Sequence, residues 1–290
     1  MKLLISGANG QLGLALTRRL CDAHELVALS RDAFDLVDAN ACHEVVHRER
    51  PDVLLNCAAY TAVDRAESEP ELAHAINAEG PNHLAKSCRE LGVFLVHFST
   101  DYVFDGRATQ PYVETDATAP TSVYGRTKLE GEARIAEVSP EYLILRLSWV
   151  YGNDGANFYK TMLRLAQDRP RLRVVADQWG IPNYTADLAN AVAHTLNRPL
   201  AELRSLSGLY HFSSQGLTTW RDFASAIIEG SGLADRVIVE PILTSEYPTA
   251  ATRPAYSALQ ASRFTATFNW SAPYWQDGLR RCLADRKMSA

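Results

Sequence analysis

The chain has 290 residues, of which 47% are hydrophobic and 22% are charged, a composition that excludes disordered and fibrous proteins. Its 29 Lys and Arg residues are outnumbered by 34 Asp and Glu residues, and a net charge of −5 offers no basic surface for nucleic acid or an anionic membrane. Five scattered cysteines without a Cys-x-x-Cys pair are typical of reduced thiols. The first apolar stretch is too short for a signal peptide, and no run reaches the roughly 18 apolar residues of a membrane span. We therefore expect a soluble cytoplasmic protein that binds neither nucleic acid nor membrane.

Short apolar runs alternate with helical patterns in the first half of the chain. The runs that predict strands are 3–5, 26–29, 53–56, 93–98 and 142–147. Leu12, Leu16 and Leu20 recur every four residues and predict a helix over 10–20. Apolar strands separated by helices are typical of a parallel sheet that is covered on both faces. Such sheets bind their ligands at the carboxyl ends of the strands.

The alternation loosens after about Trp149. Helices are predicted over 158–167, 187–197 and 220–229, a short strand is predicted at 237–239, and prolines recur between them. We predict an α/β protein with a Rossmann-type doubly wound parallel sheet and a second, smaller α/β substrate lobe. The NAD(P)-binding domain is expected over 1–150 with about 184–200, and the substrate lobe over about 151–183 and 201–290.

A glycine-rich loop separates the first predicted strand from the first predicted helix. Gly7, Gly10 and Gly13 follow a G-x-x-G-x-x-G spacing. Gly7 permits a sharp turn, Gly10 lets backbone approach a pyrophosphate, and Gly13 allows close packing of helix on strand. The helix start then offers unpaired N–H groups to phosphates. Any βα turn can carry a glycine, but this context predicts dinucleotide binding, with Gln11 and Leu12 also at the cofactor.

The end of the second predicted strand indicates which cofactor binds. An acidic residue there would hold the ribose 2′-OH of NAD, whereas an arginine accommodates the 2′-phosphate of NADP. This chain has Ser30 and Arg31 at that place, so we expect NADPH, with NADH as the alternative. Further cofactor contacts are expected from residues after the second and third strands and at the end of the fourth, namely Asp35, Leu36, Ala58, Ala59, Tyr60 and Phe98.

A second group of polar residues predicts the reaction centre. Ser99, Thr100 and Asp101 follow a buried strand, and Tyr124 and Lys128 share one face of a predicted helix. An ammonium beside a phenol favours the phenolate, so Lys128 is expected to lower the pKa of Tyr124. Thr100 could bind the same substrate oxygen from the strand side. A Tyr-x-x-x-Lys pair alone is commonly a surface pair, but with the glycine loop it predicts catalysis.

These motifs resemble the extended short-chain dehydrogenase/reductases and, within them, the dTDP-4-dehydrorhamnose reductase family. The resemblance covers essentially the whole chain. The matching stretches are 7–13, 56–67, 99–106, 124–128, 147–152, 177–182 and 253–254.

The resemblance implies NAD(P)H-dependent reduction of the C4 ketone of dTDP-4-dehydro-L-rhamnose to dTDP-L-rhamnose, the last step of dTDP-rhamnose biosynthesis, which serves cell-surface polysaccharide. It makes Thr100, Tyr124 and Lys128 the catalytic set, with Tyr124 as proton donor and Lys128 also at the nicotinamide ribose. Asn77 is expected in a supporting proton relay. The residues expected at the dTDP-sugar are Thr100, Asp101, Trp149, Asn157 and Arg253.

One departure from the family concerns metal and assembly. Some members bridge a dimer through Mg²⁺ with an acidic residue in the first helix. Residues 14–16 are Leu-Ala-Leu here and offer no carboxylate to a hard cation. We therefore expect no Mg²⁺ bridge and no metal ligands, and both a monomer and a homodimer stay open.

Related functions form the alternatives. Another NDP-sugar 4-reductase or a 4-epimerase would share the Tyr/Lys pair, and a non-catalytic regulatory subunit like the methionine adenosyltransferase β subunit would share the ancestry. A 4,6-dehydratase is disfavoured, because that class has a second acid where Tyr102 follows Asp101.

His43 to His47 spell His-Glu-x-x-His, the pattern of zinc proteases. Inside a dinucleotide-binding fold we interpret it as a connecting helix, with Val45 and Val46 buried and the histidines outward. A protease would also need a third ligand and a cleft around this helix.

Overall fold

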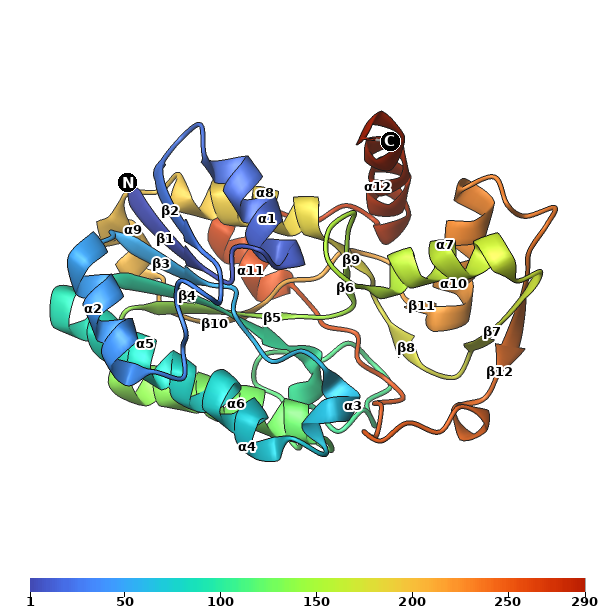
Figure 1. Cartoon of the computed structure of the whole chain (residues 1–290), viewed down its shortest axis with the longest axis horizontal. Helices are drawn as coiled ribbons and strands as arrows, with labels where there is room; N and C mark the ends of the chain where they lie inside the picture. Colours follow the sequence, from blue (N-terminus) through green and yellow to red (C-terminus); the bar gives the residue numbers. More distant parts are fainter. Residues whose placement is uncertain (290) are drawn as a thin grey trace.

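The computed structural model describes residues 1–289 and contains a parallel sheet of six strands in the order β2-β1-β3-β4-β5-β10 (Figure 1). The strands are β1 (Lys2–Ser6), β2 (Glu25–Leu29), β3 (Val53–Asn56), β4 (Phe94–Thr100), β5 (Tyr142–Leu147) and β10 (Gly208–His211). From β1 the chain first crosses to β2 on one side and then returns to β3 on the other. The strand order therefore reverses between β1 and β3, where doubly wound sheets bind their ligands.

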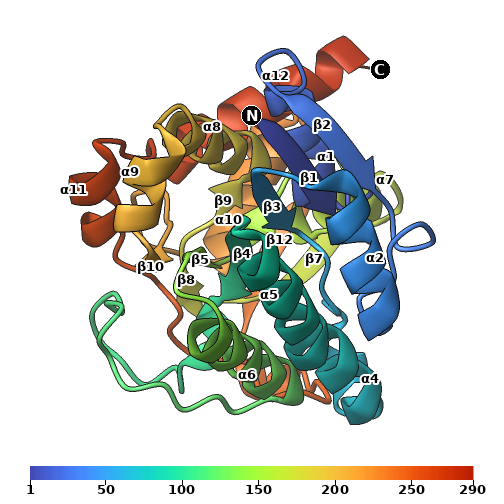
Figure 2. The ribbon, with the colours of Figure 1, turned by 90° about the vertical axis from the view of Figure 1, so that its left-hand side faces the viewer.

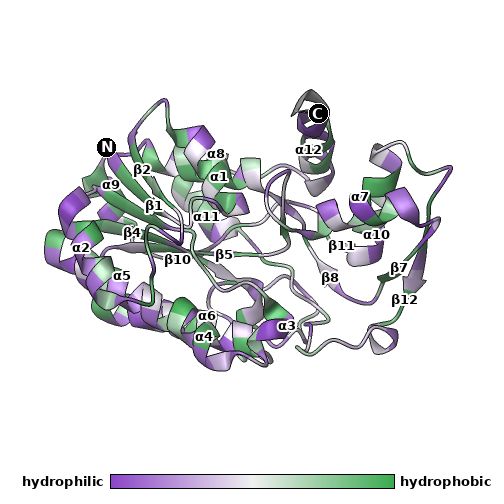
Figure 3. Cartoon of the chain, viewed as in Figure 1, coloured by the Kyte–Doolittle hydropathy of each residue, from purple (hydrophilic) through white to green (hydrophobic). Residues whose placement is uncertain are grey.

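Helices cover both faces of this sheet, because successive side chains of a strand point to opposite faces and both kinds are apolar. Leu3 and Ile5 pack toward one helical layer and Leu4 toward the other. The first layer contains α1 (Gln11–Leu20), α8 (Thr185–Leu196), α9 (Leu200–Ser205) and α11 (Ser262–Phe268). The second contains α2 (Ala39–Glu49), α5 (Gly80–Leu91) and α6 (Val123–Val138) (Figure 2). Hydrophobic residues follow the central strands between these layers (Figure 3).

Short helical segments connect the sheet to the second layer. They are α3 (Val63–Ala66), α4 (Pro70–His74), the π-helical turn η1 (Ala75–Glu79) and the 3-10 turn η2 (Asp101–Val103). The turn η1 leads directly into α5, and η2 directly follows β4.

The second, smaller lobe lies beyond the carboxyl ends of the sheet strands (Figure 1). Three helices, α7 (Phe158–Asp168), α10 (Trp220–Gly230) and α12 (Trp275–Ser289), share a core that includes Tyr159 and Phe223. The parallel pair β7 (Arg171–Val175) and β12 (Ile238–Ile242) lies beside them. The remaining elements are the pairs β6 (Val150–Tyr151) with β9 (Asn183–Tyr184) and β8 (Trp179–Gly180) with β11 (Thr218–Thr219), and the turn η3 (Thr244–Glu246).

The predicted α/β fold with its doubly wound parallel sheet is confirmed. Two segments lie elsewhere than predicted: β10 pairs with β5, and α11 packs Phe264 and Phe268 near Tyr210, so both belong with the sheet. Residues 201–290 were predicted to lie in the second lobe. Within residues 1–289, no helix is long and apolar enough to cross a membrane.

A buried ion pair fixes α6 against the sheet. Arg146 on β5 donates from Nε and Nη2 to the two carboxylate oxygens of Glu132, at 2.9 and 2.7 Å. The Ser99 hydroxyl of β4 donates to the same carboxylate, and Arg146 also lies over the Phe104 ring. Both charged side chains are less than 8% exposed. This pair therefore connects α6 to β4 and β5 next to Thr100.

Replacing Glu132 by Ala should lower the free energy of unfolding by about 3–5 kcal/mol, because it leaves the Arg146 guanidinium buried without its counter-charge. Urea denaturation of the purified protein measures the change. Glu130→Ala is the matched control on the same helix, since its partly exposed pair with Arg134 contributes about 1 kcal/mol or less. Equal losses in the two variants would contradict the role of the buried pair.

Candidate active site

A cavity of about 320 Å³ opens at the point where the strand order reverses. Eight residues predicted at the cofactor line it: Gly7, Gly10, Arg31, Asp35, Leu36, Ala58, Ala59 and Tyr60. Seven further lining residues were not predicted: Asn9, Phe34, Cys57, Thr61, Ala62, Arg65 and Ile76. They come from the same loops, after β1, β2 and β3, and from α3 and η1. The predicted loops therefore meet in one cavity.

The glycine loop forms a cradle that side chains would fill. Gly7 has a φ of +67°, and a Cβ there would lie 2.7 Å from the amide nitrogen of Ala58. A Cβ on Gly13 would overlap the carbonyl oxygen of Gly7. The first turn of α1 has neither a side-chain cap nor an acidic residue, so its N–H groups suit an anion. The cradle fits the pyrophosphate of a dinucleotide.

The side chains of the two residues after Gly10 have other contacts. Leu12 is buried in the core between α1 and the sheet. Gln11 reaches toward the second lobe, where its Nε2 lies 3.4 Å from the Val150 carbonyl oxygen and its Oε1 accepts from Asn157. Any contact of these two residues with the cofactor stays a prediction.

The loop after β2 presents Arg31 to the cavity. The Ser30 carbonyl accepts from the amides of Ala33 and Phe34, and this turn leaves Arg31 exposed while Phe34 is buried. A guanidinium at the rim of a phosphate site can accept a further anion. The position fits the predicted contact with a 2′-phosphate.

The reaction centre forms where β4 meets the first turn of α6. Ser122 caps α6 by accepting from the amide of Gly125, and a Cβ on Gly125 would overlap the Tyr102 carbonyl. This close approach brings Tyr124 to β4, where its hydroxyl lies beside Thr100. One turn further along, the Lys128 Nζ donates to the carbonyl of Phe98 at 2.7 Å. The structure therefore brings together the predicted catalytic set and Phe98.

Burial controls the charge of both catalytic groups. Tyr124 keeps part of its surface accessible, yet packing around the phenol raises its pKa above the ordinary value, against a lowering effect of Thr100. Burial also lowers the pKa of Lys128 to about 8. The expected lowering of the Tyr124 pKa by Lys128 is thus not seen in this structure. Desolvation raises the pKa of Tyr124, Lys128 is not among the groups that shift it, and the Lys128 nitrogen is bound to the Phe98 carbonyl instead.

A buried polar chain behind Lys128 was not predicted. The Lys128 Nζ lies 3.0 Å from Nε2 of His97, and the other ring nitrogen lies 3.0 Å from Nδ2 of Asn56. Oδ1 of Asn56 accepts from the Ser6 hydroxyl and from the amide of Ala58, a cavity-lining residue. These residues look like ordinary strand positions in the sequence. Only the parallel alignment of β1, β3 and β4 brings them together.

Asn77 connects the cavity wall to α6. Its amide donates to the Tyr60 carbonyl and to the Thr127 hydroxyl, and its Oδ1 accepts from the Tyr60 amide at 2.8 Å. The residue lies in η1 and is buried. Asn77 thus holds the residue next to Lys128, and its predicted part in a proton relay stays a prediction.

Asp101 has a free oxygen at the reaction centre. It is 2% exposed, and its Oδ1 accepts from the Thr100 hydroxyl at 3.0 Å. Its Oδ2 makes no hydrogen bond to any described residue. Burial raises the pKa of this carboxyl to about 7, although the Ser257 and Thr100 hydroxyls and nearby backbone N–H groups oppose the shift. Asp101 is therefore able to donate or accept near neutral pH.

Trp149 lies between the lobes. Its φ is +44°, its Nε1 donates to the Ser257 hydroxyl at 3.1 Å, and its ring stacks on Trp220 at 3.5 Å between centroids. Gly180 leaves room for this ring, since a Cβ there would overlap the indole. The Ser257 hydroxyl also opposes the pKa shift of Asp101, so two predicted substrate residues lie around this one side chain.

The two remaining predicted substrate residues, Arg253 and Asn157, lie in different surroundings. Arg253 lies beside the centre: it donates to the Tyr102 hydroxyl at 3.1 Å and pairs with Asp64 at 2.6 Å, and the Tyr102 ring contacts the Tyr124 ring edge-on. Asn157 caps α7 and donates to carbonyl oxygens of the preceding loop. Its polar atoms are therefore engaged in local structure, and a substrate contact stays a prediction.

A glycine cradle at the reversal point and a Thr/Tyr/Lys centre beside it define a Rossmann-fold, NAD(P)-dependent oxidoreductase of the short-chain type. Residues 1–288 match the model of the RmlD substrate binding domain family, and the chain belongs to this family.

Known proteins of similar sequence and structure support this family membership. A dTDP-4-dehydrorhamnose reductase of Salmonella typhimurium is 42% identical over 297 residues, which cover 98% of either chain. A dTDP-4-dehydrorhamnose reductase structure from Clostridium acetobutylicum superposes with a TM-score of 0.93 at 38% identity, covering 99% of this chain and 100% of that one. A Bacillus anthracis dTDP-4-dehydrorhamnose reductase in complex with NADP gives 0.93 at 38% identity, covering 98% and 99%.

Asp101→Asn should remove a pH dependence of stability. Because its pKa is raised to about 7, the folded protein holds a proton on Asp101 that the unfolded chain has lost above about pH 4. Wild-type stability should therefore fall by a few kcal/mol relative to the Asn variant as the pH rises from about 4 to 7, and level off above. Urea denaturation across this range measures the difference.

Asp105→Asn is the control for this prediction. The backbone amide of Arg107 and other contacts lower the pKa of Asp105, so its contribution has the opposite sign and is lost as the pH falls. Parallel stability curves for wild type and Asp101→Asn would show that Asp101 is ionised throughout.

Proposed function

We propose that the protein is an NAD(P)H-dependent reductase that converts the C4 ketone of dTDP-4-dehydro-L-rhamnose to the alcohol of dTDP-L-rhamnose. The observation that carries this proposal is the placement of Tyr124 beside Thr100, with Lys128 one turn further along α6, in a centre beside the glycine cradle. The 42% identity with the Salmonella enzyme over 98% of the chain supports the choice of substrate.

The loops around the cavity suit a dinucleotide cofactor. The backbone of Gly7 and Gly10 would hold the pyrophosphate, Arg31 the 2′-phosphate, and Asp35 and Leu36 the adenosine end. The Bacillus anthracis relative was solved with NADP, which agrees with the preference that Arg31 predicts. When bound, the reduced cofactor supplies the hydride for the carbonyl carbon.

The chain's own residues manage the proton. Thr100 and Tyr124 would hold the substrate oxygen between their hydroxyls, and the Tyr124 O–H donates its proton as that oxygen becomes negative. Burial keeps Tyr124 protonated beforehand, because it raises the pKa of the phenol. The remaining phenolate regains its proton from solvent, and Lys128, one turn further along α6, would hold the nicotinamide ribose. One ketone, one hydride and one proton give one alcohol.

The substrate would lie where the two lobes meet. Asp101 has a free carboxylate oxygen there, Trp149 offers an indole between the lobes, and Arg253 places a cation beside Tyr102. The net charge of −5 makes such placed cations necessary, because a dTDP-sugar is itself an anion. All five cysteines are free thiols, which fits action on a sugar nucleotide in the cytoplasm. Both a monomer and a homodimer would accommodate this site.

A coupled assay tests the function directly. The protein is given dTDP-4-dehydro-6-deoxyglucose together with the 3,5-epimerase that precedes the reduction, and NADPH oxidation is followed. Oxidation that depends on both components supports the reductase. No oxidation while NADPH still binds would overturn it, and stoichiometric NAD in the purified protein would favour a 4-epimerase. Binding to a partner protein without turnover would favour a regulatory subunit.

Tyr124→Phe should lower kcat roughly 10²–10⁴-fold, because it removes the proton donor, while NADPH affinity stays close to that of wild type. The coupled assay and a fluorescence titration with NADPH measure the two effects. Tyr210→Phe is the matched control, since it removes a phenol whose hydroxyl is bound to the Leu206 carbonyl. Full turnover of Tyr124→Phe would exclude Tyr124 as the acid.

Arg31→Ala should raise the KM for NADPH roughly ten- to hundredfold and leave that for NADH nearly unchanged, because only NADPH has the 2′-phosphate. Steady-state kinetics with both cofactors measure this. Arg65→Ala is the control: Arg65 lines the same cavity but is paired with Glu69, so it should affect both cofactors alike. Equal changes for NADPH and NADH in Arg31→Ala would show that Arg31 does not select the cofactor.

A further inference from the structure

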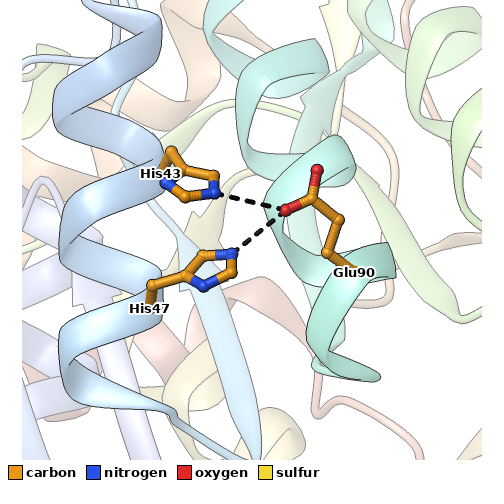
Figure 4. Close-up of side chains that lie close together, drawn as sticks. All are labelled: His43, His47 and Glu90. Carbon is orange, nitrogen blue, oxygen red and sulfur yellow. Dashed lines mark hydrogen bonds and ion pairs between the residues drawn. The ribbon is translucent and has the colours of Figure 1, made fainter.

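Two histidines of α2 point at one carboxylate of α5, on the outer side of the second helical layer (Figure 4). The Nε2 atoms of His43 and His47 lie 3.3 and 3.1 Å from the same oxygen, Oε2 of Glu90. All three ligand atoms lie within 4.8 Å of one another. His43 and Glu90 are exposed and His47 is half-buried, so the cluster is open to solvent.

The helices present these side chains on a rigid support. His43 and His47 are one turn apart on α2, and their rings stack with centroids 3.8 Å apart. On the buried side, Val45 and Val46 of α2 pack in one core with Leu84 and other residues of α5. The distance between the two helices is therefore set by the core and does not depend on the surface cluster.

The spacing suits a metal ion. Zinc binds imidazole nitrogen at about 2.0–2.1 Å and carboxylate oxygen at about 2.0–2.2 Å, so two such ligands of a tetrahedral ion lie about 3.3 Å apart. The distances of 3.3 and 3.1 Å from Oε2 of Glu90 to the Nε2 atoms of His43 and His47 match this ligand-to-ligand distance. Histidine nitrogen with one carboxylate favours Zn²⁺, Ni²⁺ or Cu²⁺ over Mg²⁺ and Ca²⁺, which prefer oxygen ligands.

We propose that His43, His47 and Glu90 form a binding site for a zinc-class divalent ion that clamps α2 to α5. Three protein ligands leave the remaining coordination position to water. The site lies outside the reaction centre and is independent of the proposed function. It is also not a protease site, since none of its residues lines the 320 Å³ cavity at the reversal point.

A clamp at this place would act on the wall of the cofactor cavity. The loop before α2 contributes Asp35 and Leu36 to that wall. The start of α5 supports the same loop, because the His83 ring lies 3.1 Å from the Leu36 carbonyl oxygen and Gly80 approaches the Leu36 side chain so closely that a Cβ would not fit. A bound ion would hold the two helices together around this loop and raise the unfolding temperature.

No metal was expected from the sequence, because the third ligand is 43 positions away from His47. The His-Glu-x-x-His pattern supplies two ligands at the spacing of one helical turn. Glu90 joins them only because α2 and α5 pack side by side.

Zinc binding to the full chain tests the proposal. Cys21 is an exposed thiol, so all proteins carry Cys21→Ser and are first stripped of metal. Isothermal titration with Zn²⁺ and thermal unfolding with and without Zn²⁺ should show one bound ion per chain and a higher unfolding temperature. Both effects should be lost in His43→Gln/His47→Gln and weakened in Glu90→Gln, and Mg²⁺ should give neither.

His74→Gln is the matched control. The Nε2 of His74 lies 3.1 Å from a carboxylate oxygen of Glu130, like the pairs in the cluster, but this pair has a single histidine. Zinc binding and the shift in unfolding temperature should survive this change. No zinc binding by the Cys21→Ser protein, or binding of unchanged affinity in either cluster variant, or its loss in His74→Gln, would overturn the proposal.

Discussion

The backbone contact between Gly7 and Gly13 is the constraint on which the cofactor side of the molecule depends. A single methyl group at either glycine would meet backbone, of Ala58 at the first and of Gly7 at the second. Without side chains, α1 can start directly against the ends of β1 and β3. Its uncapped N–H groups then face the place where the strand order reverses. The cavity, and the loops that line it, follow from this close approach.

The catalytic side depends on charges that are held away from water. Lys128 and Glu132 lie on neighbouring turns of α6, and both are buried. Glu132 is neutralised by Arg146, while Lys128 is held by the carbonyl of Phe98. Because leaving either charge unpaired is costly, α6 has one favourable position on the sheet. That position places Tyr124 beside Thr100, so the geometry of the proposed proton donor is set by ionic contacts of other residues.

Periodicity and motif spacing predict much of this structure, for a physical reason. Strands buried on both faces are apolar throughout, and the glycine loop needs its residue types for backbone geometry. The edge strand β10 has four residues and few apolar ones, so nothing marks it before it pairs with β5. His97 and Asn56 lie inside strands and acquire their contacts only through register. The direction of the Tyr124 pKa shift depends on desolvation, which spacing along a helix does not reveal.

The two nitrogens of the His97 ring connect the Asn56 amide to the Lys128 nitrogen. A neutral imidazole has one N–H and one lone pair. Oδ1 of Asn56 is taken by Ser6 and by the amide of Ala58, so the Asn56 NH₂ faces His97 and uses that lone pair. The remaining N–H points at Lys128, which can accept it only as a free amine. An ammonium at Lys128 would instead need the lone pair that Asn56 occupies, so the charge of Lys128 and the orientation of the Asn56 amide beside Ala58 are linked through the His97 ring.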